Sequence, residues 1–133
     1  MPEKKTIERA HKAKRQGKAP TTQAGEFVRE EIEHVREGKH GARSTEQAIA
    51  IGLSKARRAG VRLKPPAKVR TSRATRRHAQ RDYAVGRTHR RRKPSARRAR
   101  ATLRALKREP KRTVSSKALS RQARRSAQRR KAA

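Results

Sequence analysis

The sequence predicts a mainly α-helical protein: a small two-helix hairpin with long basic arms that are largely disordered or conditionally helical. Apolar residues make up 30% of the 133 residues, and Phe27 and Tyr83 are the only aromatic ones apart from histidine. Large side chains supply most of the free energy of a core, so the chain supports one small folded unit at most. Lys and Arg number 42 against 10 Asp and Glu, a net charge of +32 that opposes compaction elsewhere.

The first arm, residues 1–20, is rich in lysine and has Gly17 and Pro20 near its end. Its apolar residues form no continuous stripe; they are Ile7, Ala10, Ala13 and Ala19. We expect a mobile basic arm here.

The first helix of the hairpin is predicted from Thr21 or Thr22, which can cap it, to about Glu37, with Gly38 ending it. Its apolar residues share one face at spacings of four and three; they are Val28, Ile32 and Val35, with Phe27 beside them.

The second helix is predicted to begin at Ser44 and to end at Gly60. Ser44 and Gln47 have the spacing of a capping box, and Gly60 suits the position after a C-terminus. The core expected between the two helices comprises Phe27, Val28, Ile32, Val35, Ile49, Leu53, Val61 and Leu63.

A domain boundary is expected at Pro65 and Pro66, since two prolines in succession interrupt a helix. The domains are therefore residues 1–20, 21–64 and 65–133. Residues 67–133 hold 26 Lys and Arg and 2 Asp and Glu. Short helices are predicted at residues 71–84, 95–109 and 116–132, separated by Gly86, Pro94 and Pro110. Like charges weaken such helices, so we expect this tail to gain helix when phosphates neutralise it.

The charge indicates a nucleic-acid-binding protein that neutralises phosphates, because a polyphosphate is the natural counter-charge. Twenty of the 26 cations after residue 66 are arginine, which grips phosphate through two parallel hydrogen bonds. So few aromatic residues make no stacking platform for single strands, which favours duplex DNA over RNA. We expect a sequence-non-specific, nucleoid-associated or histone-like protein of the cytoplasm, and no apolar run is long enough to cross a membrane.

Three alternatives stay open. The first is an RNA-binding or ribosome-associated assembly protein, which charge alone does not distinguish from a DNA-binding one. The second is a plasmid-maintenance or interaction protein that forms a homodimer through the faces of Val28 and Ile51. The third is an inert tail that only solubilises the chain.

The candidate phosphate contacts are basic residues together with one helix-capping serine. The loop at residues 38–44 combines two glycines and two cations before a helix, which is typical either of a phosphate cradle or of an ordinary connection. The predicted set is Lys39, Arg43, Ser44, Lys55, Arg57, Arg58, Arg76, Arg77, Arg90, Arg91, Arg92, Arg97, Arg98, Arg124, Arg125, Arg129 and Arg130.

Neither a catalytic site nor a metal or cofactor site is predicted, so we expect a non-enzyme. The histidines lack the spacing of metal ligands; they are His11, His34, His40, His78 and His89. The glutamates of the first hairpin helix fit a solvated helix face; they are Glu26, Glu30, Glu31, Glu33 and Glu37. No set of nucleophile, base and orienting group can be picked out.

The run RSTEQAIAIGLSKARRAG, residues 43–60, resembles a group of small basic bacterial proteins, some of them labelled DNA-binding or plasmid-stabilisation proteins. The motif of that group corresponds here to residues 47–57, and the resemblance extends over residues 26–64. It implies a bacterial origin, a helix–loop–helix core and a role connected with DNA.

Overall fold

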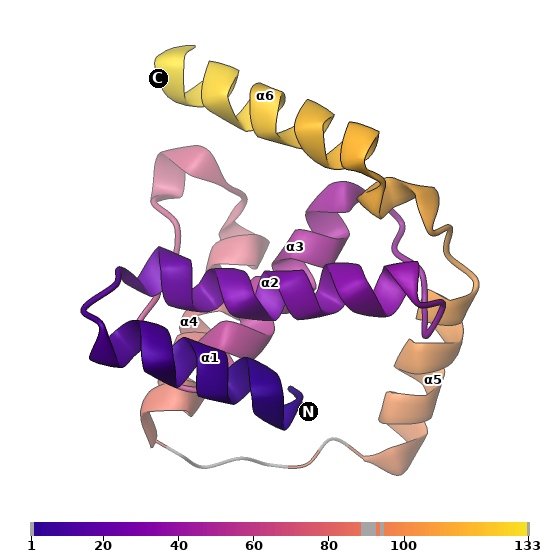
Figure 1. Cartoon of the computed structure of the whole chain (residues 1–133), viewed down its shortest axis with the longest axis horizontal. Coiled ribbons are helices and arrows are strands. Elements are labelled where there is room, and N and C mark those ends of the chain that lie inside the picture. The colour runs from indigo at the N-terminus through magenta and orange to yellow at the C-terminus, as the bar shows by residue number, and fades with distance from the viewer. Residues whose placement is uncertain (1, 89–92, 94, 133) are drawn as a thin grey trace. The chain divides into compact units, whose positions relative to one another are not determined.

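The structure, a computed structural model, describes residues 2–88, 93 and 95–132. Within these residues the chain forms only helices and connecting segments (Figure 1). The mainly helical class is therefore confirmed. The α-helices are α1 (Lys4–Arg15), α2 (Pro20–Arg36), α3 (Thr45–Arg58), α4 (Arg73–Thr88), α5 (Ala96–Lys107) and α6 (Ser116–Ala132), and the short 3-10 helices are η1 (Lys68–Arg70) and η2 (Arg112–Val114).

The chain divides into two compact units. Unit 1 comprises Met1–Glu30 and Ala50–Lys93, and unit 2 comprises Glu31–Ile49 and Pro94–Ala133. The division passes through α2 and α3, so each of these helices contributes residues to both units. Pro65 and Pro66 lie inside unit 1, and no helix crosses them.

The expectation of a two-helix hairpin with disordered arms is wrong, because both arms form helices that belong to the folded units. In unit 1, the N-terminal arm forms α1 and buries Ala10 and Ala13. Ala10 joins a core cluster with Ala24, Phe27, Ala56 and Val61, against which Ile7, Leu53, Ala59 and Leu63 also pack. Alanines let helix backbones come close together, so a core with few large side chains still recruits the arm.

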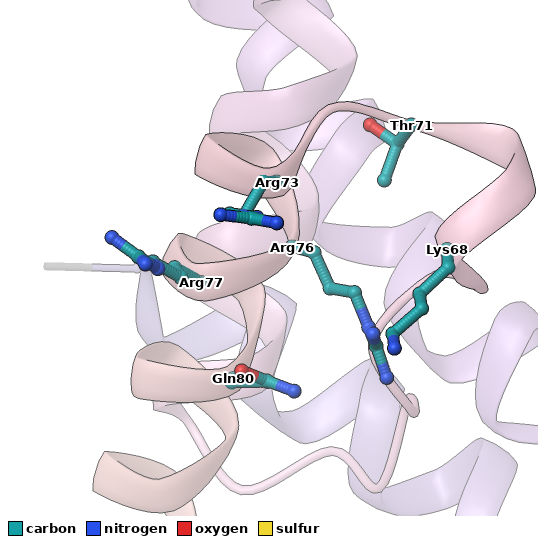
Figure 2. A pocket seen from close by; sticks show the side chains of 6 residues that line it. All are labelled: Lys68, Thr71, Arg73, Arg76, Arg77 and Gln80. Atoms are coloured by element: carbon teal, nitrogen blue, oxygen red, sulfur yellow. The ribbon is translucent and has the colours of Figure 1, made fainter.

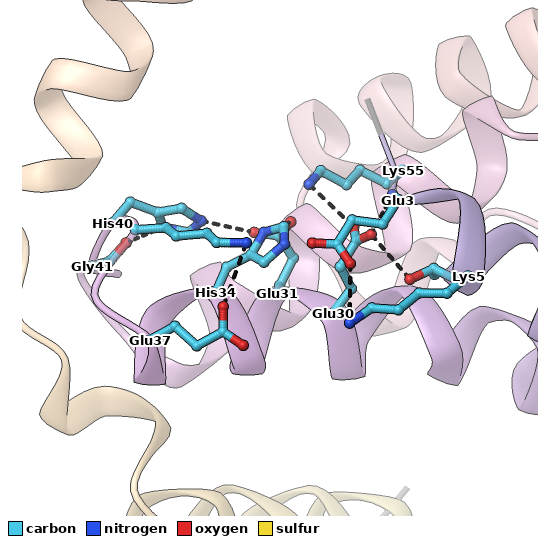
Figure 3. Close-up of polar contacts among 11 residues, drawn as sticks. Glu3, Lys5, Glu30, Glu31, His34, Glu37, His40, Gly41 and Lys55 are labelled. Atoms are coloured by element: carbon cyan, nitrogen blue, oxygen red, sulfur yellow. Dashed lines mark hydrogen bonds and ion pairs between the residues drawn. The ribbon is translucent and has the colours of Figure 1, made fainter.

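Glu30, on α2, connects α1 and α3 within unit 1 (Figure 3). One carboxylate oxygen accepts hydrogen bonds from the Glu3 backbone N–H at 2.5 Å and from the Thr6 hydroxyl at 3.0 Å. The other oxygen lies 3.5 Å from the Lys55 ammonium group. Glu30 is buried, so the interpretation of this glutamate as part of a solvated helix face is wrong. A buried carboxylate needs such partners, and they attach the arm to the hairpin.

Two glycines permit close approach of helices in unit 1. A Cβ atom added to Gly52 on α3 would lie 2.6 Å from the Val28 Cα atom on α2. A Cβ atom added to Gly86 would collide with the Arg57 carbonyl oxygen. Gly86 was expected to separate helices, yet α4 continues through it to Thr88. The contact with Arg57 explains the glycine, because only a residue without a side chain fits there.

Unit 2 has its own small core, made of Val35, Ala42, Ala48 and Val114, with Ile32 packed beside them. Six of the eight predicted core residues are divided between the two clusters, and neither cluster includes Val28 or Ile49. The loop after α2 pairs with the segment before α6: the Gly41 and Ala42 amides donate to the Leu106 and Pro110 carbonyl oxygens at 2.8 and 3.0 Å. The Arg36 guanidinium group donates to the Val114 carbonyl oxygen as well. These contacts fold the C-terminal segment onto the hairpin loop.

The helix ends follow the capping residues that the sequence contains. The Ser44 hydroxyl accepts the Gln47 amide at 3.1 Å, as a capping box predicts, while the Gln47 side chain accepts the Arg43 amide. Gly38 and Gly60, which follow α2 and α3, have φ angles of +81° and +100°. In the tail, serine hydroxyls cap α4, α5 and α6; they belong to Ser72, Ser95 and Ser115.

Candidate nucleic-acid interface

The helices α5 and α6 of unit 2 are strongly cationic. They carry five and seven Lys or Arg residues respectively and no Asp or Glu. Neither helix has a fully buried residue, and Leu103 on α5 is 43% exposed. Since a globular helix normally buries one face, these two helices present their charge to solvent instead. They include the predicted contacts Arg97, Arg98, Arg124, Arg125, Arg129 and Arg130, all of them exposed.

A hollow lies beside the first turns of α4 in unit 1 (Figure 2). Its volume is about 410 Å³. Figure 2 shows the charged ends of Lys68, from η1, and Arg76, from α4, extending toward the same side of the hollow. The six lining residues include no carboxylate; they are Lys68, Thr71, Arg73, Arg76, Arg77 and Gln80.

The electrostatics of this hollow favour an anion. The N-terminus of a helix carries a partial positive charge, so the cations Arg73, Arg76 and Arg77 near the start of α4 repel it and one another. The Arg76 Nε atom is buried and has no hydrogen-bond partner among the described residues. A buried donor without an acceptor costs about 1–3 kcal/mol. A phosphate oxygen would supply both the acceptor and the missing negative charge.

Three predicted contacts on α3 have partners inside unit 1. The Lys55 ammonium group faces Glu30, and the Arg58 guanidinium group lies 3.8 Å from the Asp82 carboxylate. The Arg57 side chain is buried and donates to the carbonyl oxygens of residues 63 and 64 at 3.1 and 3.3 Å. Burial lowers the pKa of Arg57, and the Asp82 charge raises it. The Arg57 donors therefore hold the segment that follows α3, and the assignment of Arg57 to phosphate binding stays a prediction.

The loop at residues 38–44 is not the open phosphate cradle that the sequence allowed. The amides of Gly41, Ala42 and Arg43 all donate within the chain, and Gly41 and Ala42 are buried. Lys39 lies 3.4 Å from the Glu37 carboxylate, and Ser44 caps α3. Arg43 and Lys39 are both exposed, but Lys39 is paired with Glu37.

The remaining predicted contacts differ in their surroundings. Arg76 and Arg77 lie in the hollow beside α4. Arg125 makes a 3.1 Å ion pair with Glu46, in which both side chains are about half exposed. Arg90, Arg91 and Arg92 lie outside the described residues.

Phe27 and Tyr83, the two aromatic residues other than histidine, both make contacts within unit 1. Phe27 is 1% exposed and belongs to the core. The Arg87 guanidinium carbon lies 5.7 Å from the centre of the Tyr83 ring, a cation–π distance. Neither ring is presented as an open platform for a nucleobase.

The sequence analysis missed two groups of residues. In the hollow it missed Lys68, Thr71, Arg73 and Gln80, although Arg73, Arg76, Arg77 and Gln80 have the spacing of one helix face. It also assigned no metal ligands, whereas the structure brings Glu31, His34 and His40 of unit 2 together (Figure 3). A Glu-x-x-His spacing at residues 31–34 was the available signal, and His40 joins only through the loop.

Comparison of the chain with models of protein families, with curated proteins and with solved structures finds no match. The resemblance over residues 26–64 thus stays an expectation from the sequence. Among the described residues, no helix combines the length and the apolar character that crossing a bilayer requires.

Proposed function

We propose that this protein binds duplex nucleic acid through its phosphates, without reading the base sequence, and that DNA is its main ligand. The observation that carries the proposal is the hollow beside α4, which four cations and no carboxylate line, and where the buried Arg76 Nε atom has no acceptor among the described residues. The helices α5 and α6 add a solvated cationic surface of twelve side chains. Phosphate contacts of this kind position a protein on a duplex but carry no sequence information.

The choice of a duplex over a single strand rests on the aromatic residues. Proteins that bind single strands stack bases on exposed rings, and here Phe27 is buried and Tyr83 faces Arg87. A duplex keeps its bases stacked internally and offers only phosphates and grooves. We propose accordingly a nucleoid-associated or histone-like role in a bacterial cytoplasm, without catalysis.

The dependence of binding on salt tests the electrostatic mechanism. With about six to ten phosphate contacts, affinity for a duplex falls at least about a thousand-fold between roughly 50 and 200 mM salt. Fluorescence anisotropy with labelled duplexes of two unrelated sequences measures it. We expect the two duplexes to give similar dissociation constants and similar slopes. A flat salt curve would refute the mechanism, and a large difference between the sequences would refute the lack of specificity.

The hollow is tested with a fourfold variant, in which Lys68, Arg73, Arg76 and Arg77 are replaced by Ala. A control of equal charge loss replaces exposed cations on α1; it changes Lys4, Arg9, Lys12 and Arg15 to Ala. If phosphates sit in the hollow, the first variant loses at least about tenfold more affinity than the control at equal salt. Equal losses would mean that the overall field, and not the hollow, holds the ligand.

Competition at fixed salt decides between DNA and RNA. Labelled duplex DNA is displaced by unlabelled duplex DNA or by structured RNA of the same phosphate content. We expect DNA to compete at least as well, and displacement by much less RNA would assign the protein to RNA or ribosome assembly instead.

A homodimer is a further part of the proposal, since doubling the cationic surface would double the phosphate contacts. The faces of Val28 and Ile51 were its expected contact, but Val28 lies against Gly52 inside unit 1. Ile51 is half-buried. Analytical ultracentrifugation at high protein concentration checks the dimer, and a single monomeric species would remove it.

A further inference from the structure

Glu31, His34 and His40 form a small polar cluster in unit 2, apart from the proposed phosphate contacts. Glu31 and His34 lie on the last turns of α2, and His40 lies on the loop that follows (Figure 3). One ligand atom from each residue lies within 4.8 Å of those of the other two. The cluster combines a carboxylate with two imidazoles, which are common ligands of zinc and similar divalent ions.

Burial sets this cluster apart from an ordinary surface ion pair. The side chains of Glu31, His40 and His34 are 1%, 9% and 14% exposed. A carboxylate removed from water needs a compensating positive charge close to it. Its Oε2 atom lies 3.2 Å from His40 Nε2, and its Oε1 atom lies 3.8 Å from His34 Nδ1.

The contact between His40 Nδ1 and the Gly41 carbonyl oxygen indicates which ring nitrogen of His40 faces Glu31 as an acceptor. His40 Nδ1 lies 2.9 Å from the Gly41 carbonyl oxygen, which can only accept, so Nδ1 carries a proton. In a neutral imidazole, Nε2 then presents a lone pair to the Glu31 carboxylate. Two facing lone pairs at 3.2 Å repel each other, and a metal ion bound by both atoms would remove that repulsion. Metal-bound histidines commonly donate their second N–H to a carbonyl oxygen, as His40 does here.

The spacing also fits a tetrahedral ion. Bond lengths of about 2.0–2.1 Å to nitrogen and oxygen place tetrahedral ligand atoms roughly 3.3 Å apart. The 3.2 Å from Glu31 Oε2 to His40 Nε2 comes close to this value, while His34 Nδ1 lies 3.8 Å from the other carboxylate oxygen, Oε1. Three protein ligands leave a fourth position for water.

We propose that Glu31, His34 and His40 bind one divalent transition-metal ion of the zinc class. The ion joins α2 to the loop whose Gly41 amide donates to the Leu106 carbonyl oxygen, so it stabilises unit 2. This inference is independent of the proposed nucleic-acid function, because none of the three residues belongs to the phosphate contacts.

The test uses the full chain without a histidine tag, freed of metal by a chelator and of nucleic acid by a high-salt wash. Zinc chloride is titrated by isothermal calorimetry in a buffer without phosphate, and cobalt(II) reports the geometry through its visible absorption. We expect one equivalent of zinc, the intense spectrum of tetrahedral cobalt, and a melting temperature that rises with zinc. Absence of stoichiometric binding would overturn the proposal.

Variants identify the ligands. His34→Ala and His40→Ala should each weaken zinc binding at least about tenfold and abolish the tetrahedral cobalt spectrum. The exposed histidines provide matched controls, and His11→Ala and His78→Ala should bind as the unmodified chain does. Circular dichroism checks that each variant is folded. If His40→Ala is not folded, His34→Ala decides, and unchanged binding by that variant would overturn the site.

Discussion

Glycine at position 52 is required by contact and not by backbone conformation. A Cβ atom there would lie 2.6 Å from the Val28 Cα atom and 2.9 Å from the Val28 nitrogen, and backbone atoms cannot move aside as a flexible side chain can. The two helices would have to separate, although alanine forms helices more readily than glycine.

We expect Gly52→Ala to destabilise the protein by about 1–2 kcal/mol, the overpacking penalty reduced by the gain in helix propensity. Gly25→Ala is the matched control, because Gly25 lies on α2 with nothing within 4 Å of an added Cβ atom. It should stabilise by about 0.5–1 kcal/mol. Urea unfolding monitored by circular dichroism measures both. A stabilising Gly52→Ala would contradict the close helix contact.

At the scale of elements, η2 and α6 divide the roles of anchoring and charge in the C-terminal segment. Val114 of η2 is fully buried in the cluster of unit 2, and its carbonyl oxygen accepts from Arg36. The helix α6 has no fully buried residue and carries seven cations. The link from α6 to Glu46 is an exposed ion pair, a type that contributes little stability.

A chain that ends after Ser115 lacks α6 and should lose less than about 2 kcal/mol of stability. Its affinity for duplex DNA should fall, and the salt slope should decrease by about 0.9 for each phosphate that α6 contacted. A chain that ends after Lys111 also lacks Val114 and should be clearly less stable. Thermal melts and salt titrations of the two truncated chains compare these roles. Equal stability of both would contradict the anchoring role of Val114.

At the scale of the whole molecule, the helices of the arms change the effect that nucleic-acid binding is expected to have on helical content. The sequence suggested that the tail becomes helical when phosphates neutralise it, whereas in the structure α4, α5 and α6 are parts of the two folded units. Serine caps at the start of each, and burial of Ala79 and Gly86 on α4, oppose the repulsion between like charges.

We therefore expect far-UV circular dichroism of the free protein to show a strongly helical chain already. Saturating duplex DNA should change the helical signal only slightly, because serine caps and contacts within the units already support these helices. Salt without DNA is the control, since it screens the same repulsion. A large helical gain with DNA would instead indicate a tail that folds on binding.

The local features of this protein were predictable from the sequence. The positions of α2 to α6, the cap at Ser44 and the glycines after α2 and α3 follow from periodicity and capping, which depend on residues a few positions apart. The excess of positive charge, and hence the kind of ligand that would neutralise it, follows from composition alone. Alanine positions such as Ala10 gave no usable signal, because alanine is common both in cores and on surfaces.

Only the tertiary structure decided which charged side chains bind other groups of the protein and which remain accessible to a ligand. Arg57 and Arg76 were both predicted to bind phosphate from the sequence. In the structure, Arg57 donates to carbonyl oxygens, whereas Arg76 lines a hollow and its Nε atom has no acceptor among the described residues. The Glu31 carboxylate lies next to the His40 imidazole only because the loop after α2 folds back onto that helix. Burial and pairing arise from residues far apart in the chain, so helical periodicity does not reveal them, whereas charge and helix formation are largely local properties.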